Sequence, residues 1–231
     1  MITEWIIKPV KISFDKQKQF IADASHELKT PLSVIVASSE ALEDNPEEKK
    51  WLKNIKNEAE RMNLLITDLL ELAESENQVQ KNYEIGDLSK TVELSVLTFE
   101  GKIYEKKRKL IYQIEESIQM KMNENSIRQL VEILLDNAIK HAKEKGRIEV
   151  SLRQKGSEII LEVKNQGKEI PKEELEKIFE RFYRVDKARN RSENHYGLGL
   201  AIAKNIVENH HGKISASSLD GVTTFKVVFK K

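Results

Sequence analysis

The sequence predicts two domains: an all-α helical hairpin, followed by an α+β two-layer sandwich. Its 231 residues suffice for one or two domains. Between residues 14 and 78 there is no glycine, and this absence favours long helices. All nine glycines lie from Gly86 onward, where strand-like alternation is mixed with helical segments. We therefore expect a linker over 1–13, the helical domain over 14–78 and the sandwich over 82–231.

Composition limits the classes of function. The chain has 39 Lys and Arg against 38 Asp and Glu, a net charge of +1, which argues against a nucleic-acid-binding role. Without cysteine it has no disulfide, thiolate metal site or cysteine nucleophile. No run is as long and apolar as a membrane span. The apolar segment 5–10 is either the cytosolic edge of a preceding membrane helix or a frayed terminus.

The helical hairpin is predicted from apolar residues that recur at steps of three and four. Residues 44–47, Asp-Asn-Pro-Glu, form a turn between the two helices, with proline where the second helix can begin. A lone hairpin leaves an apolar stripe exposed, so we expect a homodimer that completes a four-helix bundle. The predicted inward-facing positions are Ile21, Ala24, Leu28, Leu32, Ile35, Ser39 and Leu42, then Leu52, Ile55, Ala59, Met62, Ile66, Leu69 and Ala73.

His26 is the first candidate for chemistry. It lies two residues from the inward-facing Leu28, a rotation of about 200°, and is therefore expected to face solvent. Thr30 lies one turn further on the same face, and Pro31 is expected to loosen or kink the helix. A solvent-facing imidazole beside the carboxylate of Glu27 is suited to nucleophilic attack. On spacing alone, an ordinary exposed helix histidine remains the alternative.

Residues 20–32, Phe-Ile-Ala-Asp-Ala-Ser-His-Glu-Leu-Lys-Thr-Pro-Leu, resemble the phospho-acceptor box of bacterial sensor histidine kinases. The resemblance implies that His26 takes the γ-phosphoryl group of ATP and passes it to an aspartate of a response regulator. It also implies that Glu27 assists proton transfer. Thr30 would position water when the same domain dephosphorylates the regulator.

The second domain is predicted to mix strands with helices rather than alternate them regularly, which favours an α+β sandwich. The last two strands are joined by an Asp220-Gly221 turn. The expected strands are 148–152, 160–163, 213–216 and 225–229, and the expected helices are about 124–144, 171–179 and 200–210.

Asn137, Lys140 and His141 share one face of the helix expected at 124–144. An amide oxygen can bind a hard cation, and Lys and His can contact phosphate oxygens. Taken alone, these residues are better explained as a solvated helix face. Residues 134–140 nevertheless resemble the asparagine box of the kinase ATP domain, which implies that Asn137 binds Mg²⁺.

Three further segments resemble boxes of the same ATP domain: 163–171 the first glycine box, 178–186 the phenylalanine box and 197–204 the second glycine box. Glycines before a helix let backbone N–H groups approach phosphates. The resemblance implies a GHKL-type ATPase fold that uses ATP and Mg²⁺, with Arg184 near the transferring phosphoryl group. The polar, basic segment 187–196 is interpreted as a lid, with a plain exposed loop as the alternative. The implied nucleotide-binding residues are Asn137, Lys140, His141, Asn165, Gly167, Ile170, Phe182, Gly197, Leu198, Gly199 and Leu200.

The chain departs from the family pattern at four positions. Asn165 stands where the first glycine box usually has Asp, whose carboxylate accepts a hydrogen bond from the adenine amino group. An uncharged acceptor should weaken this bond by about 1 kcal/mol, which predicts reduced nucleotide affinity. Glu169 and His195 occupy common glycine positions, and Ile133 occupies the place of the first asparagine of the asparagine box.

Together these features predict the cytoplasmic catalytic core of a homodimeric sensor histidine kinase, held at a bacterial membrane by a preceding segment. Its expected partners are a second copy of the chain and a response regulator receiver domain, and no nucleic acid. One alternative is a signalling scaffold that turns over ATP poorly, and another is a protein whose main output is regulator dephosphorylation. A chaperone or topoisomerase ATPase is disfavoured because neither needs the phospho-acceptor box.

Overall fold

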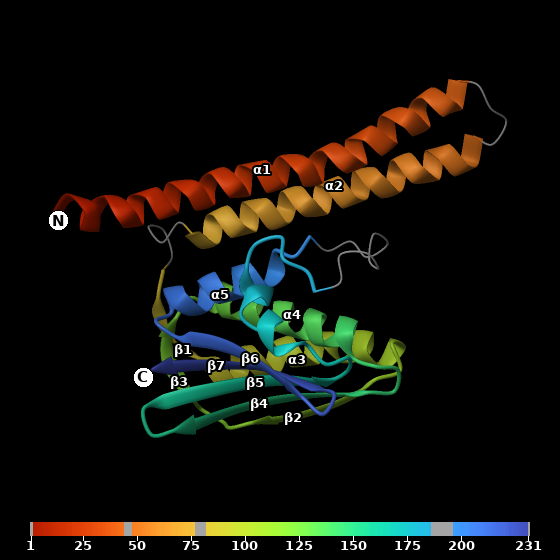
Figure 1. Cartoon of the computed structure of the whole chain (residues 1–231). Coiled ribbons are helices and arrows are strands. Elements are labelled where there is room, and N and C mark those ends of the chain that lie inside the picture. Colours follow the sequence, from red (N-terminus) through yellow and green to blue (C-terminus); the bar gives the residue numbers. More distant parts are fainter. Residues whose placement is uncertain (1, 44–47, 77–81, 186–195, 231) are drawn as a thin grey trace. The chain divides into compact units, whose positions relative to one another are not determined.

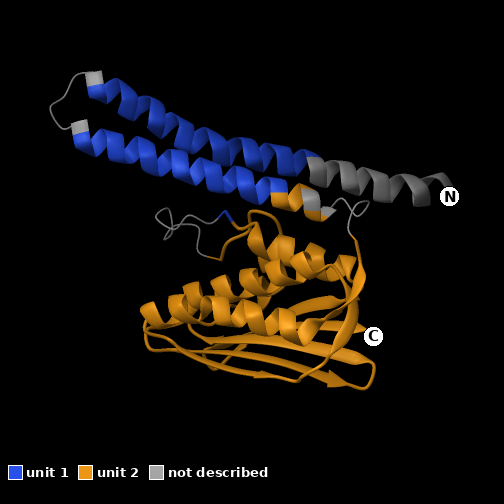
Figure 2. Cartoon of the chain, turned by 180° about the vertical axis from the view of Figure 1, so that it is seen from behind, with its two compact units in different colours: residues 1–70, 188–196 blue, residues 71–187, 197–231 orange. Residues whose placement is uncertain are grey.

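The structure is a computed structural model that describes residues 2–43, 48–76, 82–185 and 196–230. Side chains of the first helix are described from residue 18 onward. The chain divides into two compact units, the first of residues 1–70 and 188–196, the second of residues 71–187 and 197–231 (Figure 2). Each unit is described by itself below.

The first unit is built on helices α1 (Ile2–Glu43) and α2 (Glu48–Glu76), which confirms the predicted helical hairpin (Figure 1). The predicted turn at 44–47 lies outside the described residues. Helix α1 continues through Pro31 and includes the segment predicted as a linker. Of the described helices, none contains a stretch long and apolar enough to cross a membrane.

The predicted inward-facing seam is only partly correct within a single chain. Ile21, Leu32, Leu52 and Ile66 are 58%, 51%, 49% and 45% exposed. The helices carry more apolar residues than one contact face can hold, so a second apolar face remains at the surface. The described residues of α1 and α2 that are buried occupy other positions: Pro31, Ser38, Leu65, Leu72 and Ser75.

The second unit is a two-layer sandwich, as predicted: helices α3, α4 and α5 cover one face of a five-stranded sheet (Figure 1). The strand order is β2-β4-β5-β7-β6, with β2 parallel to β4 and the other pairs antiparallel. Strands β1 and β3 form a separate two-stranded sheet. The helices are α3 (Leu88–Glu105), α4 (Glu124–His141) and α5 (Gly199–Asn209); the strands are β1 (Glu84–Asp87), β2 (Lys109–Ile114), β3 (Gln119–Met122), β4 (Arg147–Lys155), β5 (Glu158–Gln166), β6 (Lys213–Leu219) and β7 (Val222–Lys230).

The core of this unit follows from alternating burial along the strands. In β7, Phe225, Val227 and Phe229 are buried and the residues between them are partly exposed, as expected for a sheet with one covered face. Two helices begin with side-chain caps: Asp87 accepts from the Lys90 N–H (3.0 Å), and Asn123 accepts from the Ser126 N–H (2.9 Å).

A buried histidine fixes the start of α4. The His210 ring accepts a hydrogen bond from the Asn123 N–H at Nε2 (3.1 Å) and therefore donates from Nδ1 to the Ile206 carbonyl (2.7 Å). The Tyr83 ring packs on it with centroids 4.9 Å apart, and burial raises the pKa of the Tyr83 hydroxyl. These contacts tie α4 and α5 to the beginning of the domain.

The prediction of an α-helix at 171–179 is wrong. The segment forms two short 3₁₀-helices, η2 (Lys172–Glu174) and η3 (Lys177–Phe179). Neither has a side-chain cap, and their hydrogen bonds reach back three residues, as from the Glu174 N–H to the Pro171 carbonyl (2.9 Å). In this segment burial is confined to Ile178 and Phe179, so no apolar stripe supports a longer helix.

Candidate functional site

The candidate phospho-acceptor, His26, lies on α1 with its side chain exposed, as its spacing from Leu28 predicts. Glu27 beside it is also exposed. Because Pro31 has no N–H, the carbonyl of Glu27 receives no helical hydrogen bond from that position. The imidazole is therefore accessible to a reacting group from solvent, with a carboxylate as its neighbour.

Hydroxyl side chains surround His26 along the same helix. Thr30 Oγ1 donates to the backbone carbonyl of His26 (3.3 Å). Ser25 donates to the carbonyl of Ile21 (2.7 Å), and Ser33 to that of Lys29 (2.9 Å). A hydroxyl that donates its proton keeps two lone pairs as acceptors. Thr30 can therefore accept a hydrogen bond from a water molecule one turn from His26.

The first nucleotide-site element is α4. Its inner face, from Ile127 to Ala138, is buried in the sandwich core, whereas Asn137 and Lys140 are half-buried and His141 is exposed. An ion pair between Asp136 and Lys102 joins α4 to α3. The helix thus presents its amide and its cation on the side away from the core, as the shared face of these residues predicts.

Asn165 near the end of β5 is the most unusual residue of the second unit. It is 2% exposed, and its position pairs with Ile148 of β4 and Thr223 of β7. Neither Nδ2 nor Oδ1 has a hydrogen-bond partner among the described residues. An unsatisfied buried amide costs roughly 1–3 kcal/mol, so this side chain suits a ligand that supplies the missing donor and acceptor.

Gly167 allows α4 and β5 to approach each other closely. A Cβ at this position would lie 2.0 Å from the carbonyl oxygen of His141 and 3.2 Å from Asn165 Nδ2. Gly167 forms a β-bridge with Ala142 and donates its N–H to the Gly221 carbonyl (2.8 Å). The structure therefore brings the end of α4, the first glycine box and the β6–β7 turn together.

The phenylalanine box and the second glycine box also meet. Phe182 has φ of 59° and donates its N–H to the Gly197 carbonyl (3.1 Å). Gly197 has φ of +76°, and a Cβ there would lie 2.7 Å from the Tyr183 carbonyl oxygen. A residue with a side chain would be strained in that conformation, so the glycine is required for this turn.

Helix α5 begins directly after this turn. The preceding residue, Leu198, is fully buried and accepts from the Ile202 N–H (2.9 Å), but no side chain caps the helix. The first N–H groups of such a helix, with its positive partial charge, favour a phosphate. Leu200 is half-buried in the first turn, and a Cβ on Gly199 would meet only Ile133 Cγ2, at 3.5 Å.

The Asn165 amide, which has no partner among the described residues, could bind the edge of a nucleotide base. The first N–H groups of α5, which no side chain caps, could bind its phosphates. Two family models match the chain: "His Kinase A (phospho-acceptor) domain" over residues 16–78, and "Histidine kinase-, DNA gyrase B-, and HSP90-like ATPase" over residues 122–231. The chain belongs to the sensor histidine kinase family.

Relatives and solved structures agree with this assignment. Sensor protein DltS of Streptococcus agalactiae is 38% identical over 218 residues, covering 93% of this chain and 54% of DltS. Histidine kinase AdeS of Acinetobacter baumannii has a TM-score of 0.68 at 26% identity, covering 89% of this chain and 97% of AdeS. Histidine kinase ThkA, solved in complex with response regulator protein TrrA, has the same fold, with a TM-score of 0.79 at 23% identity over 100% of this chain and 66% of ThkA.

The kinase core spans about half the length of the curated relatives it matches: 54% of DltS, 48% of sensor histidine kinase YkoH of Bacillus subtilis and 50% of ArlS of Staphylococcus haemolyticus. The candidate phospho-acceptor and the candidate nucleotide-binding residues fall in different units, with His26 in the first and Asn137, Asn165 and Gly167 in the second. The predicted lid, residues 187–196, lies outside the described residues apart from Tyr196, and its His195 is among those not described. Arg184, just before it, is half-buried.

Sequence reasoning missed a pair of buried hydroxyl residues beside the candidate nucleotide-binding residue Ile170. The Ile170 N–H donates to Ser218 Oγ (3.0 Å), and the Ser218 and Thr223 hydroxyl oxygens lie 2.9 Å apart. Both hydroxyl residues are buried on neighbouring strands. Thr223 is one of the alternate residues of β7 that face the core. A polar residue at such a position could have indicated a buried hydroxyl pair.

Proposed function

We propose that this chain is the catalytic core of a homodimeric kinase that phosphorylates its own His26 from ATP and transfers the phosphoryl group to an aspartate of a response regulator. The observation that carries the proposal is the buried amide of Asn165 beside Gly167, which has no partner among the described residues, in a chain that also exposes His26 on a helix. The relative ThkA is described in complex with a response regulator, which supports the choice of partner.

In the proposed reaction the imidazole nitrogen of His26 attacks the γ-phosphorus in line with the leaving oxygen. A nitrogen–phosphorus bond forms, the bond to the β-phosphate oxygen breaks, and ADP leaves. Glu27 takes up the ring proton. Arg184 stabilises charge on the transferring group, and the backbone from Gly197 to Leu200 holds the phosphates.

The ligand set for Mg²⁺ fits this role. The described residues contain no group of three His, Cys, Asp or Glu side chains that would hold a metal ion by themselves. Mg²⁺ in phosphoryl-transfer sites is bound mostly by water and nucleotide phosphates, with one or two protein oxygens. The amide oxygen of Asn137 would be such a ligand. Lys140 and His141 lie on the same face of α4, where they could contact the phosphates.

Labelling with γ-³²P ATP and Mg²⁺ tests the kinase proposal. We expect acid-labile, base-stable label on the chain, lost completely in His26→Ala. His211→Gly is the matched control, because His211 is exposed and its φ of 56° suits glycine. Absence of label at millimolar ATP, with nucleotide binding retained, would favour the scaffold alternative.

The regulator phosphatase is a second proposed activity, supported by the free acceptor lone pairs of Thr30. Thr30→Ala should lower dephosphorylation of the phosphorylated regulator at least tenfold and leave labelling of His26 within twofold. Ser33→Ala is the control, since its hydroxyl makes the same contact one turn further along α1. Equal loss in both variants would assign the effect to the helix rather than to Thr30.

The second apolar face of the hairpin is the proposed dimer surface. Ile21, Leu32, Leu52 and Ile66 would complete a four-helix bundle with a second copy. Leu52→Glu and Ile66→Glu should therefore yield a monomer by light scattering at micromolar concentration. Membrane attachment of the longer protein remains a proposal that rests on the apolar segment 5–10 of the sequence.

A further inference from the structure

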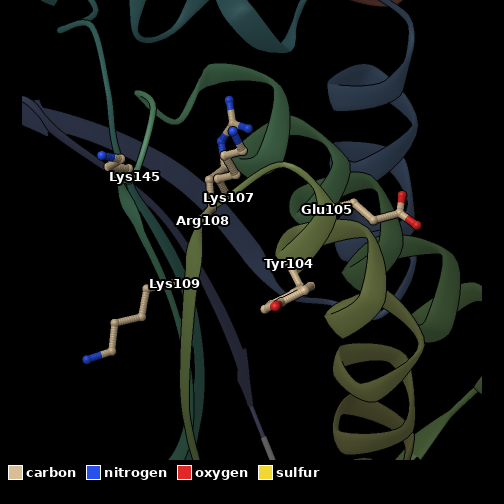
Figure 3. A pocket seen from close by; sticks show the side chains of 6 residues that line it. All are labelled: Tyr104, Glu105, Lys107, Arg108, Lys109 and Lys145. Atoms are coloured by element: carbon tan, nitrogen blue, oxygen red, sulfur yellow. The ribbon is translucent and has the colours of Figure 1, made fainter.

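A pocket of about 580 Å³ lies where α3 ends, β2 begins and the turn after α4 returns to the sheet (Figure 3). None of the proposed nucleotide-binding residues lines it. Its lining side chains are Tyr104, Glu105, Lys107, Arg108, Lys109 and Lys145.

The pocket carries strong positive charge. Its lining has four cationic side chains against one carboxylate, Glu105, which points away from Lys109 and Lys145 in Figure 3. Lys107, Lys109 and Lys145 form no ion pair with any carboxylate in the described part of the chain. Like charges held at one site repel each other, and a bound anion would relieve the repulsion.

The cations stand on a fixed framework rather than on a free loop. Arg108 donates from Nε and Nη2 to the Ala142 carbonyl (3.2 and 2.7 Å) and from Nη1 to the Lys106 carbonyl (2.9 Å). The Lys109 N–H donates to the Gly146 carbonyl (3.0 Å). These bonds tie the turn after α3 to the turn after α4, so both lysine-bearing turns keep their spacing.

Two of the lysines occupy backbone positions that favour glycine. Lys107 has φ of 54° and Lys145 has φ of 56°, both in the left-handed region. The residue after Lys145 is Gly146, so the left-handed position is taken by the lysine and not by the neighbouring glycine. Glycine would suit both positions, so either lysine can be replaced by glycine without disturbing the turns.

We propose that this pocket binds a small molecule carrying two or more phosphoryl groups. Its volume lies within the range of small-molecule sites, roughly 300–1,000 Å³. The lysine and arginine groups match phosphate oxygens, and the Tyr104 ring, 82% exposed, offers a flat apolar wall beside them. The ligand is distinct from the ATP of the proposed kinase reaction, because the pocket shares no lining residue with that site.

The first experiment titrates the whole chain with inorganic tripolyphosphate by calorimetry. We expect a binding event that weakens steadily as NaCl is raised and that is retained when ATP occupies the proposed nucleotide site. The double variant Lys107→Gly, Lys145→Gly should weaken binding at least tenfold without lowering Tm, because glycine suits both φ values. Lys90→Ala with Lys121→Ala removes two exposed charges elsewhere in the same unit and should change the affinity by less than twofold. Lys109→Ser supplies a second loss variant if the double variant unfolds.

A second measurement separates this pocket from the nucleotide site. The Lys107→Gly, Lys145→Gly variant should bind a fluorescent ATP analogue within twofold of the parent, whatever the outcome of the kinase assay. The proposal is overturned if no binding is seen at millimolar concentration, if the double variant binds tripolyphosphate as tightly as the parent, or if the control variant weakens binding equally. Binding to anionic phospholipid vesicles without binding to tripolyphosphate would also overturn it, in favour of a membrane surface.

Discussion

At the scale of single residues, the Asn165 amide lowers the stability of the free protein but is proposed to bind the nucleotide. Its amide is buried with both polar atoms unpartnered among the described residues. The folded protein therefore carries the desolvation cost of this group, roughly 1–3 kcal/mol, until a ligand supplies the hydrogen bonds. A side chain of similar size without polar atoms would remove that cost, and with it the proposed hydrogen bonds to the nucleotide.

Asn165→Leu is accordingly expected to raise the free energy of unfolding by about 1 kcal/mol and to abolish detectable nucleotide binding. Urea unfolding and titration with a fluorescent ATP analogue measure the two effects. Asn205→Leu is the control of opposite sign, because Asn205 Nδ2 donates to Ser75 Oγ (3.2 Å) and its loss should destabilise. Lower stability in Asn165→Leu would show that the amide is satisfied in solution.

Asn165→Asp restores the residue that the family usually carries and tests the predicted weakness of nucleotide binding. A charged acceptor strengthens a hydrogen bond by about 1 kcal/mol, so nucleotide affinity should rise roughly fivefold. Without nucleotide the same variant should be less stable, because an unpaired carboxylate would be buried. The Tm gain on adding nucleotide should therefore exceed that of the parent. Unchanged affinity would mean that position 165 does not contact the nucleotide.

At the scale of elements, α3 contains a glycine that its fold does not require. A Cβ on Gly101 would meet nothing within 4 Å, and its φ lies outside the left-handed region. Gly101→Ala should raise the free energy of unfolding by about 0.5–1 kcal/mol, because alanine favours a helix interior. Gly167→Ala, where a Cβ would lie 2.0 Å from a carbonyl oxygen, should do the reverse. Thermal unfolding of both variants compares the two sites, and a lower Tm in Gly101→Ala would contradict the prediction.

Some elements could be predicted from sequence and others could not. The strands β4 to β7 and helix α4 follow from alternation or from a single apolar stripe, as in Phe225, Val227 and Phe229. Helix α3 escaped prediction because apolar residues occur on its exposed side as well, with Leu94 48% and Leu97 43% exposed. In the hairpin, the three-and-four spacing predicted both helices but not which apolar face each one buries.

For the candidate site, motifs identified the residues but not the contacts that hold them. Asn165, Gly167 and Gly197 were found by resemblance to the family boxes. The bonds from the Gly167 N–H to the Gly221 carbonyl and from the Ile170 N–H to Ser218 Oγ join segments some fifty residues apart. Such pairings depend on sheet register, which local sequence patterns do not encode.

At the scale of the whole molecule, the end of α2 belongs to the second unit. The units divide between Leu70 and Glu71, within one continuous helix. Glu71 accepts from Gln129 Nε2 (2.8 Å), and the Ser75 carbonyl accepts from Asn209 Nδ2 (2.6 Å). A catalytic domain cut at the predicted boundary, residue 82, would lose both contacts.

A fragment of residues 71–231 should therefore be more stable than one of residues 82–231. Each lost hydrogen bond costs about 0.5–1.5 kcal/mol, which for a domain of this size predicts a fall in Tm of several degrees. Differential scanning fluorimetry of the two fragments measures the difference. In the longer fragment, Ser75→Ala controls for the Oγ contact alone and should have a smaller effect. Equal Tm values would show that these contacts add nothing to stability.

The continuity of α2 also has a structural consequence. Because α2 runs unbroken from Glu48 to Glu76, its last turns, which include Ser75, belong to the same helix as the hairpin. Asn205 and Asn209 hold Ser75 from α5, and α5 begins at Gly199, where phosphates are proposed to bind. Within the second unit, the last turns of α2 are therefore joined by side-chain hydrogen bonds to the helix that begins in the second glycine box.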